Sequence, residues 1–323
     1  MGLQLTHQYH DRLKVSYRGQ PLFDYVYNAD DIDPYSYQRP YIYPVHSTDG
    51  DLVSIFRTID HPWHLGISMT LTVVNDQNFW GGNTYIPESQ RHAIVEQGLL
   101  ARPETNKYNP DKDSYALLEN VGKTDHIAWD SLECSDTTVT FQEQLVWITS
   151  RGESWFDESR KIECSVINDE YWTINWQTHL KNISGEVLNI GSPTTLGRPN
   201  AGYGGLFWRG PRSYLNGDIL ADNGLTGEDV MGKAAPWIAY IGQHDDSLRH
   251  STLIFRDSPQ NIRYPNKWFV RNNPYGCVSF AFMFDEEYPL QPDDSLNLQY
   301  QVIIATGKRS RSDIETILNA IPL

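Results

Sequence analysis

The chain has 323 residues, of which 39% are hydrophobic and 21% charged, a balance typical of a folded globular protein rather than a disordered one. Its 26 basic and 41 acidic residues give a formal charge of −15, which disfavours nucleic acid and anionic membrane surfaces as partners. With 10 Trp, 19 Tyr and 11 Phe the sequence is rich in aromatic side chains, which favour strands and flat ligand-binding surfaces.

The cysteines and the apolar segments indicate the compartment. Cys134, Cys164 and Cys277 are widely spaced and odd in number, which fits neither a disulfide framework nor a zinc cluster. The N-terminal residues contain no apolar run typical of a signal peptide, and no segment reaches the roughly 18 apolar residues of a membrane span. We therefore expect a cytoplasmic protein, and because no linker or repeat interrupts the chain we expect one domain over residues 1–323.

Short segments of alternating apolar and polar residues predict β-strands along most of the chain. Four such pieces occupy residues 3–45, and residues 92–101 are predicted as a further strand in the otherwise irregular region 85–125. The chain ends on its one predicted helix, where Ser312 and Glu315 form a capping box before apolar residues at helical spacing. The later predicted strands cover residues 137–148, 171–184, 237–245, 250–257 and 296–307.

Residues 58–84 concentrate the side chains best suited to a pocket. Two histidines stand beside an aspartate and a proline-fixed turn, and histidine can exchange protons near neutral pH or bind a metal. Indoles in the same stretch can cover apolar ring faces. The alternative is a turn between two strands, in which the histidines cap backbone groups and the tryptophans join the core. The candidate residues are Asp60, His61, Trp63, His64, Trp80 and Asn83.

Two of the later strands also carry polar residues of interest. Glu143 shares its predicted face with four apolar side chains, so its carboxylate requires a partner or carries a raised pKa; burial beside an arginine is the alternative to a catalytic role. Asn175, Gln177 and His179 share one face of the strand over 171–184. That face is either the floor of a polar groove or a surface in solvent.

Residues 189–214 are rich in glycine but lack the spacing of a phosphate-binding loop. Their glycines permit tight turns and close approach of the backbone. Arginine and aromatic side chains in this segment suit hydrogen bonding and stacking onto a polyhydroxylated or anionic ligand. The candidates are Arg198, Tyr203, Trp208 and Arg209.

Several long segments resemble the DUF6807 family, whose members are often labelled "methane oxygenase PmoA"-like. They are RPYIYPVHSTDGDLVSIFRTIDHPWHLGIS, NFWGG, GRPNAGYGGLFWRGPR, MGKAAPWIAYIG and NKWFVRNN, in order over residues 39–306. The resemblance implies an all-β, two-sheet sandwich similar to the galactose-mutarotase-like supersandwich, and carbohydrate as the ligand class. A membrane methane monooxygenase subunit is not expected, because the sequence has no membrane span. The usual family segment DHPHHRGL reads DHPWHLGI here, so Trp63 and Leu65 replace a His and an Arg, which leaves His61 and His64.

Three hypotheses follow. The first is an enzyme for acid/base chemistry on a sugar or oxidised sugar derivative, such as epimerisation or mutarotation, hydration–elimination or hydrolysis, without a cofactor. His64 or His61 acts as acid or base there, with Asp60 or Glu143 as partner, and the ligand-binding residues are the remaining candidates named above. The second is a non-catalytic carbohydrate-binding protein, distinguished by the absence of a histidine–carboxylate pair in its pocket. The third is a metal-dependent enzyme with His46, His61 and His64 as ligands.

The expected partner is a small sugar or glycoside, and the oligomeric state stays open.

Overall fold

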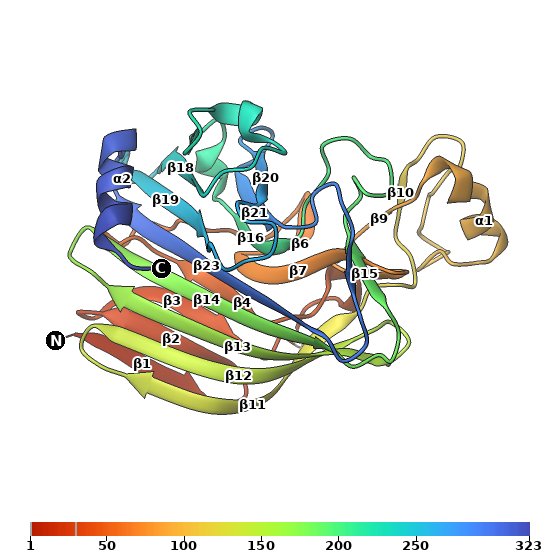
Figure 1. The fold of residues 1–323 in the computed structure, drawn as a ribbon, viewed down its shortest axis with the longest axis horizontal. Helices are drawn as coiled ribbons and strands as arrows, with labels where there is room; N and C mark the ends of the chain where they lie inside the picture. The colour runs from red at the N-terminus through yellow and green to blue at the C-terminus, as the bar shows by residue number, and fades with distance from the viewer. Residues whose placement is uncertain (1, 30) are drawn as a thin grey trace.

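The chain folds into two large antiparallel β-sheets that pack face to face, in a computed structural model that describes residues 2–29 and 31–323 (Figure 1). This arrangement confirms the predicted all-β, two-sheet sandwich with a short C-terminal helix. Among the described residues, no helix is both long and apolar enough to cross a membrane.

The larger sheet has eleven strands. Eight are hydrogen-bonded in the order β1-β2-β3-β4-β7-β16-β21-β20, while β8 and β15 attach to β7 and β22 attaches to β15. The strands are β1 (Leu3–Gln8), β2 (Arg12–Tyr17), β3 (Gln20–Val26), β4 (Tyr41–Val45), β7 (Ile67–Val74), β8 (Gln77–Phe79), β15 (Leu188–Gly191), β16 (Gly205–Arg209), β20 (Lys267–Arg271), β21 (Cys277–Ala281) and β22 (Tyr288–Leu290).

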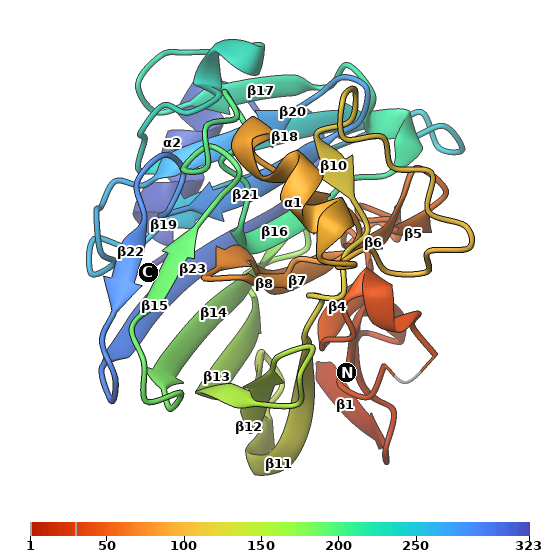
Figure 2. The same ribbon diagram turned by 90° about the vertical axis from the view of Figure 1, so that its right-hand side faces the viewer.

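The smaller sheet has eight strands in the order β11-β12-β13-β14-β23-β19-β18-β17. Its long central strands give it the curved surface visible in Figures 1 and 2. The strands are β11 (Lys123–Cys134), β12 (Thr138–Ile148), β13 (Ser154–Val166), β14 (Tyr171–Asn182), β17 (Asp218–Ala221), β18 (Trp237–Gln243), β19 (His250–Asp257) and β23 (Ser295–Thr306).

The main core lies between the two sheets and follows the period of two in the strands. In β14, Trp172 and Trp176 are fully buried in this core, whereas Gln177 and His179 on the opposite face are exposed. In β16, Leu206 and Trp208 point into the same core, and their neighbours point to the outer face of the larger sheet. The strands that build the core therefore also present a second row of side chains outside it.

Short ribbons and helical turns surround the sheets. Two paired ribbons are β5 (Phe56–Thr58) with β6 (His61–Leu65) and β9 (Thr84–Tyr85) with β10 (Tyr115–Ala116). The 3-10 turns are η1 (Pro34–Ser36), η2 (Glu88–Gln90), η3 (Arg212–Tyr214) and η4 (Gly227–Val230).

Both α-helices correct a detail of the sequence prediction. Helix α1 (Arg91–Glu96) replaces the first half of the strand predicted over 92–101, and it projects from one end of the molecule, away from the two large sheets (Figure 1). Helix α2 (Arg311–Ala320) packs on the outer face of β18, β19 and β23. Its capping box is formed by Ser310 and Asp313, two residues earlier than the predicted pair Ser312 and Glu315. The two pairs have the same spacing, so the spacing alone did not distinguish them.

Candidate active site

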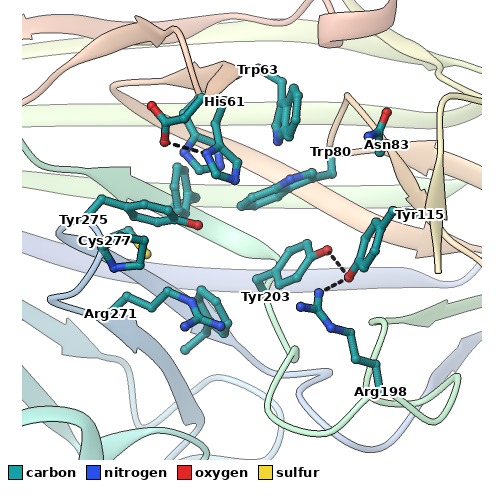
Figure 3. A pocket seen from close by; sticks show the side chains of 15 residues that line it. His61, Trp63, Trp80, Asn83, Tyr115, Arg198, Tyr203, Arg271, Tyr275 and Cys277 are labelled. Carbon is teal, nitrogen blue, oxygen red and sulfur yellow. Dashed lines mark hydrogen bonds and ion pairs between the residues drawn. The ribbon is translucent and has the colours of Figure 1, made fainter. Parts of the chain in front are cut away.

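A pocket of about 490 Å³ opens on the outer face of the larger sheet, over β16, β20 and β21 (Figure 3). Phe207, Phe269 and Cys277 form its floor, because strand alternation turns them away from the core that holds their neighbours Trp208 and Val270. The walls come from the β5–β6 ribbon, the loop after β8, and segments near residues 115, 198 and 275. An aromatic floor with polar walls suits a ligand with a flat apolar face and polar edges.

Asp60 and His61 form a hydrogen-bonded pair at the tip of the β5–β6 ribbon. Nδ1 of His61 lies 2.7 Å from Oδ2 of Asp60. Partial burial raises the pKa of Asp60, but hydrogen bonds from His61 and Arg209 outweigh it and hold this pKa well below its ordinary value. The carboxylate is therefore ionised and accepts the Nδ1 proton, which leaves Nε2 of a neutral His61 as a base.

His64 stacks on His61, with ring centroids 4.6 Å apart and an angle of 18° between the planes. Burial lowers the pKa of His64 well below its ordinary 6.5, and the neighbouring His61 and Arg209 lower it further. Nη1 of Arg209 lies 2.8 Å from Nδ1 of His64. A guanidinium only donates, so Nδ1 accepts and the proton of neutral His64 sits on Nε2. The two histidines thus differ in role: Nε2 of His61 has a free lone pair, and Nε2 of His64 carries a proton that it can donate.

The buried side chain of Arg209 contacts Asp60, His64 and Tyr275. It is 4% exposed in its side chain, binds Oδ2 of Asp60 through Nη2 at 3.1 Å, and stacks over Tyr275 at 3.6 Å from the ring centroid. Nη1 and Nη2 of Arg209 bind His64 and Asp60, and Arg209 does not line the pocket, so it orients these two side chains and is not placed to hold a ligand hydroxyl as the sequence suggested.

Two tryptophans form the wall next to the histidines. Asn78 fixes the loop that carries Trp80, since its Oδ1 accepts from the backbone N–H of Trp80 at 2.8 Å and of Gly81 at 2.9 Å. Gly82 has φ +64°, and a Cβ at this position would overlap the indole of Trp63. The NFWGG segment is therefore shaped to receive Trp63, and both indoles line the pocket together with Asn83 (Figure 3).

The opposite end of the pocket is formed by Tyr115, Arg198 and Tyr203 (Figure 3). Nη1 of Arg198 donates to the hydroxyl of Tyr115, which also lies 3.2 Å from the hydroxyl of Tyr203. Burial raises the pKa of both tyrosines, so they stay neutral and act as hydrogen-bonding groups.

The sequence matches the profile described as a family of unknown function, DUF6807, over residues 12–319. The chain belongs to this family. No curated protein matches the sequence.

Solved structures similar to this DUF6807 protein include enzymes acting on sugars. Heparan sulfate lyase HepC from Pedobacter heparinus has 10% identity and a TM-score of 0.36, covering 93% of this chain and 34% of the lyase, so the chain spans about a third of the lyase's length. Galactose 1-epimerase from Lactobacillus acidophilus NCFM has 8% identity and a TM-score of 0.37, covering 95% and 98%. A GalM/aldose epimerase homologue from C. elegans has 8% identity and a TM-score of 0.31, covering 96% and 99%. Similarity at this level transfers no activity to this chain.

The structure of this DUF6807 protein places the predicted site residue Trp208 behind the pocket. Trp208 lies in the core, where its Nε1 donates to the carbonyl of Val53 at 2.9 Å, so it cannot stack on a ligand. It follows Phe207 directly, and adjacent strand residues face opposite sides. Leu65, which replaces the family arginine, is fully buried, whereas Trp63 at the other departure lines the pocket.

Glu143 faces inward as predicted but belongs to a buried network between the two sheets. It accepts from Tyr25, lies 2.7 Å from Nδ1 of His126 and is 3.8 Å from Arg160, which forms a two-pronged ion pair with Glu158. The burial beside an arginine that the sequence left open is the observed arrangement, and Glu143 is no partner for His61.

Asn175, Gln177 and His179 lie on the outer face of the smaller sheet, on the far side of the core from the pocket. Gln177 and His179 line a shallow polar depression there, and Nδ1 of His179 lies 2.7 Å from Oδ1 of Asn297. His46 also lies outside the pocket, so His46, His61 and His64 do not form one ligand set. In residues 2–29 and 31–323 no cluster of three or more potential metal-ligating side chains is present.

Sequence reasoning missed Tyr115, Arg271, Tyr275 and Cys277, which all line the pocket. Burial raises the pKa of the Cys277 thiol to about 12, which rules it out as a nucleophile at neutral pH. Arg271 and Phe269 share one face of a five-residue strand, and this spacing was a usable signal. The choice of face, however, depends on pairing with distant strands.

Proposed function

We propose that this protein is a carbohydrate-active enzyme that performs acid/base chemistry on a sugar or oxidised sugar derivative in the pocket of Figure 3. The observation that carries the proposal is the pair formed by Asp60 and His61, whose Nδ1–Oδ2 distance is 2.7 Å, at the edge of an aromatic pocket. Epimerisation or mutarotation, hydration–elimination and hydrolysis all require such a proton acceptor.

In the proposed chemistry, Nε2 of His61 takes a proton from the substrate while Asp60 stabilises the imidazolium that forms. Nε2–H of His64 donates to the oxygen on which negative charge develops, and Arg209 keeps His64 in the tautomer that this requires. Trp63 and Trp80 offer faces for stacking on the ring of the sugar.

A non-catalytic carbohydrate-binding protein needs no histidine–carboxylate pair in its pocket. The pocket contains such a pair, and its histidine keeps Nε2 unengaged by any described residue. This observation favours an enzyme over a binding protein. The metal-dependent alternative has no comparable support, because its three histidines are not brought together.

The test is turnover of a sugar panel by one-dimensional NMR, with aldoses, glycosides and keto derivatives as substrates. The proteins are wild type, His61→Gln, His64→Ala and the control His92→Gln, which changes an exposed histidine of α1 far from the pocket lining. We expect His61→Gln to lower turnover by about 100-fold or more, since general base catalysis contributes about 10²–10⁴. The control keeps wild-type turnover.

Two results would contradict the proposal. Turnover that survives in His61→Gln would remove His61 from the chemistry. Binding of a sugar by wild type without conversion of any panel member would replace the enzyme with a carbohydrate-binding protein.

A further inference from the structure

Arg271 has no polar side-chain or backbone partner for its guanidinium among the described residues. Its guanidinium forms neither an ion pair nor a side-chain hydrogen bond with any residue in 2–29 or 31–323, a state shared by no other described arginine. The side chain lines the pocket and lies over Phe269, 5.4 Å from the ring centroid. Figure 3 shows it on the side of the pocket that holds His61 and Tyr275.

The charges around the pocket do not balance. Asp60 is its one acidic lining residue, and this carboxylate is already bound by Arg209 at 3.1 Å and approached by Arg212 at 3.8 Å. Arg198 and Arg271 also line the pocket, and neither forms an ion pair with a carboxylate of the residues that the structure describes. A positive pocket in a chain of formal charge −15 is a local feature that favours an anionic ligand.

We propose that the ligand carries a carboxylate that binds Arg271, which narrows the substrate class from sugars in general to acidic sugars such as uronic acids. This inference rests on the proposed function. The planar fork of a guanidinium matches the two oxygens of a carboxylate. The position of Arg271 on the side of His61 brings the carbon next to that carboxylate toward the base, and neutralising the carboxylate makes a proton on this carbon easier to remove.

The experiment is calorimetric binding of matched ligand pairs: glucuronate with glucose, galacturonate with galactose and mannuronate with mannose. Glucose 6-phosphate and benzoate, a carboxylate that is not a sugar, complete the set. The proteins are wild type, Arg271→Gln, Arg271→Lys and Arg18→Gln, the last removing an equal charge from an exposed pair with Asp169.

We expect wild type to bind at least one acid about tenfold or more tightly than its neutral partner. Arg271→Gln weakens binding of the acid about tenfold more than binding of the neutral sugar, and Arg271→Lys restores part of the difference because it keeps the charge without the fork. Arg18→Gln binds all ligands as wild type does.

The other outcomes separate this inference from the proposed function. Three results would contradict the proposed carboxylate site but not the proposed sugar enzyme. They are equal affinity for neutral and acidic sugars, a preference for acids that persists in Arg271→Gln, and tighter binding of glucose 6-phosphate than of the acids. Binding of benzoate without any sugar would support the carboxylate site and overturn the sugar function. Binding of none of these ligands would overturn both.

Discussion

Replacing Asp60 by asparagine tests the electrostatics of the site without knowledge of the substrate. Burial lowers the pKa of His61, and the hydrogen bond and charge of Asp60 offset part of that decrease. Asp60→Asn removes the offset, so we expect the pKa of His61 to fall further. Because His61 acts as a neutral base, activity is lost as the pH falls through this pKa, and the acid limb of the pH profile moves to lower pH in the variant.

The size of the shift follows from the distance and the exposure of the pair. Two unit charges about 4 Å apart attract by about 1 kcal/mol in water and about 4 kcal/mol at an effective dielectric constant of 20. The side chains of His61 and Asp60 are 29% and 39% exposed, which places the attraction near the lower value. At about 1.4 kcal/mol per pKa unit, the expected decrease is about one unit.

The turnover of Asp60→Asn should also fall, by about 100-fold or more. An asparagine amide can donate to Nδ1 as well as accept from it, so the tautomer with a free Nε2 is no longer enforced.

The assay is an NMR titration of the imidazole Cε1–H signals between about pH 4 and 8, with the signal of His61 assigned from His61→Gln. Asp169→Asn is the matched control, because it removes an exposed carboxylate that pairs with Arg18 away from the pocket. A pKa of His61 that stays constant or rises in Asp60→Asn would refute the reasoning, since the carboxylate would then not be stabilising the imidazolium.

Three further predictions concern stability. His64→Gln removes a group whose folded pKa lies below 6.5, so the free energy of unfolding should fall less steeply than in wild type as the pH drops from 6.5, by up to about 1.4 kcal/mol per unit in urea titrations. Glu143→Gln should lower the free energy of unfolding by about 1–3 kcal/mol, measured with urea, while ligand affinity of the pocket stays constant. Gly82→Ala should cost about 2 kcal/mol by the same measurement and weaken ligand binding in calorimetry, because Trp63 is displaced.

Local patterns in the sequence predicted the strands well. The inward faces of β12 and β14 were correct, since alternation with a period of two is contained within each strand. The wall formed by Asp60, His61 and His64 could also be predicted, because these residues lie within five positions of each other. That these three side chains converge could not be predicted, because the register of the pairing between β5 and β6 is shifted and the side chains of β6 do not alternate regularly.

The distant half of the site required the tertiary structure. Arg271 and Tyr275 lie about 200 residues beyond His61, in the hairpin of β20 and β21, and the pairing of β21 with β16 brings this hairpin to the pocket. The error on Trp208 has the same origin, because the face of β16 that looks outward is decided by its pairing with β7 and β21. Glu143 was correctly predicted to face inward, but its partners Tyr25, His126 and Arg160 come from other strands and could not be predicted from its own strand.

The two indoles beside the histidines also give the protein a built-in optical reporter. Trp63 and Trp80 line the pocket, while Trp147, Trp172, Trp176, Trp208 and Trp268 are fully buried elsewhere. A ligand that stacks in the pocket changes the surroundings of the first two and leaves the emission of the buried set constant. Intrinsic fluorescence can therefore screen unlabelled compounds, and Trp80→Phe would show how much of a signal arises at the site.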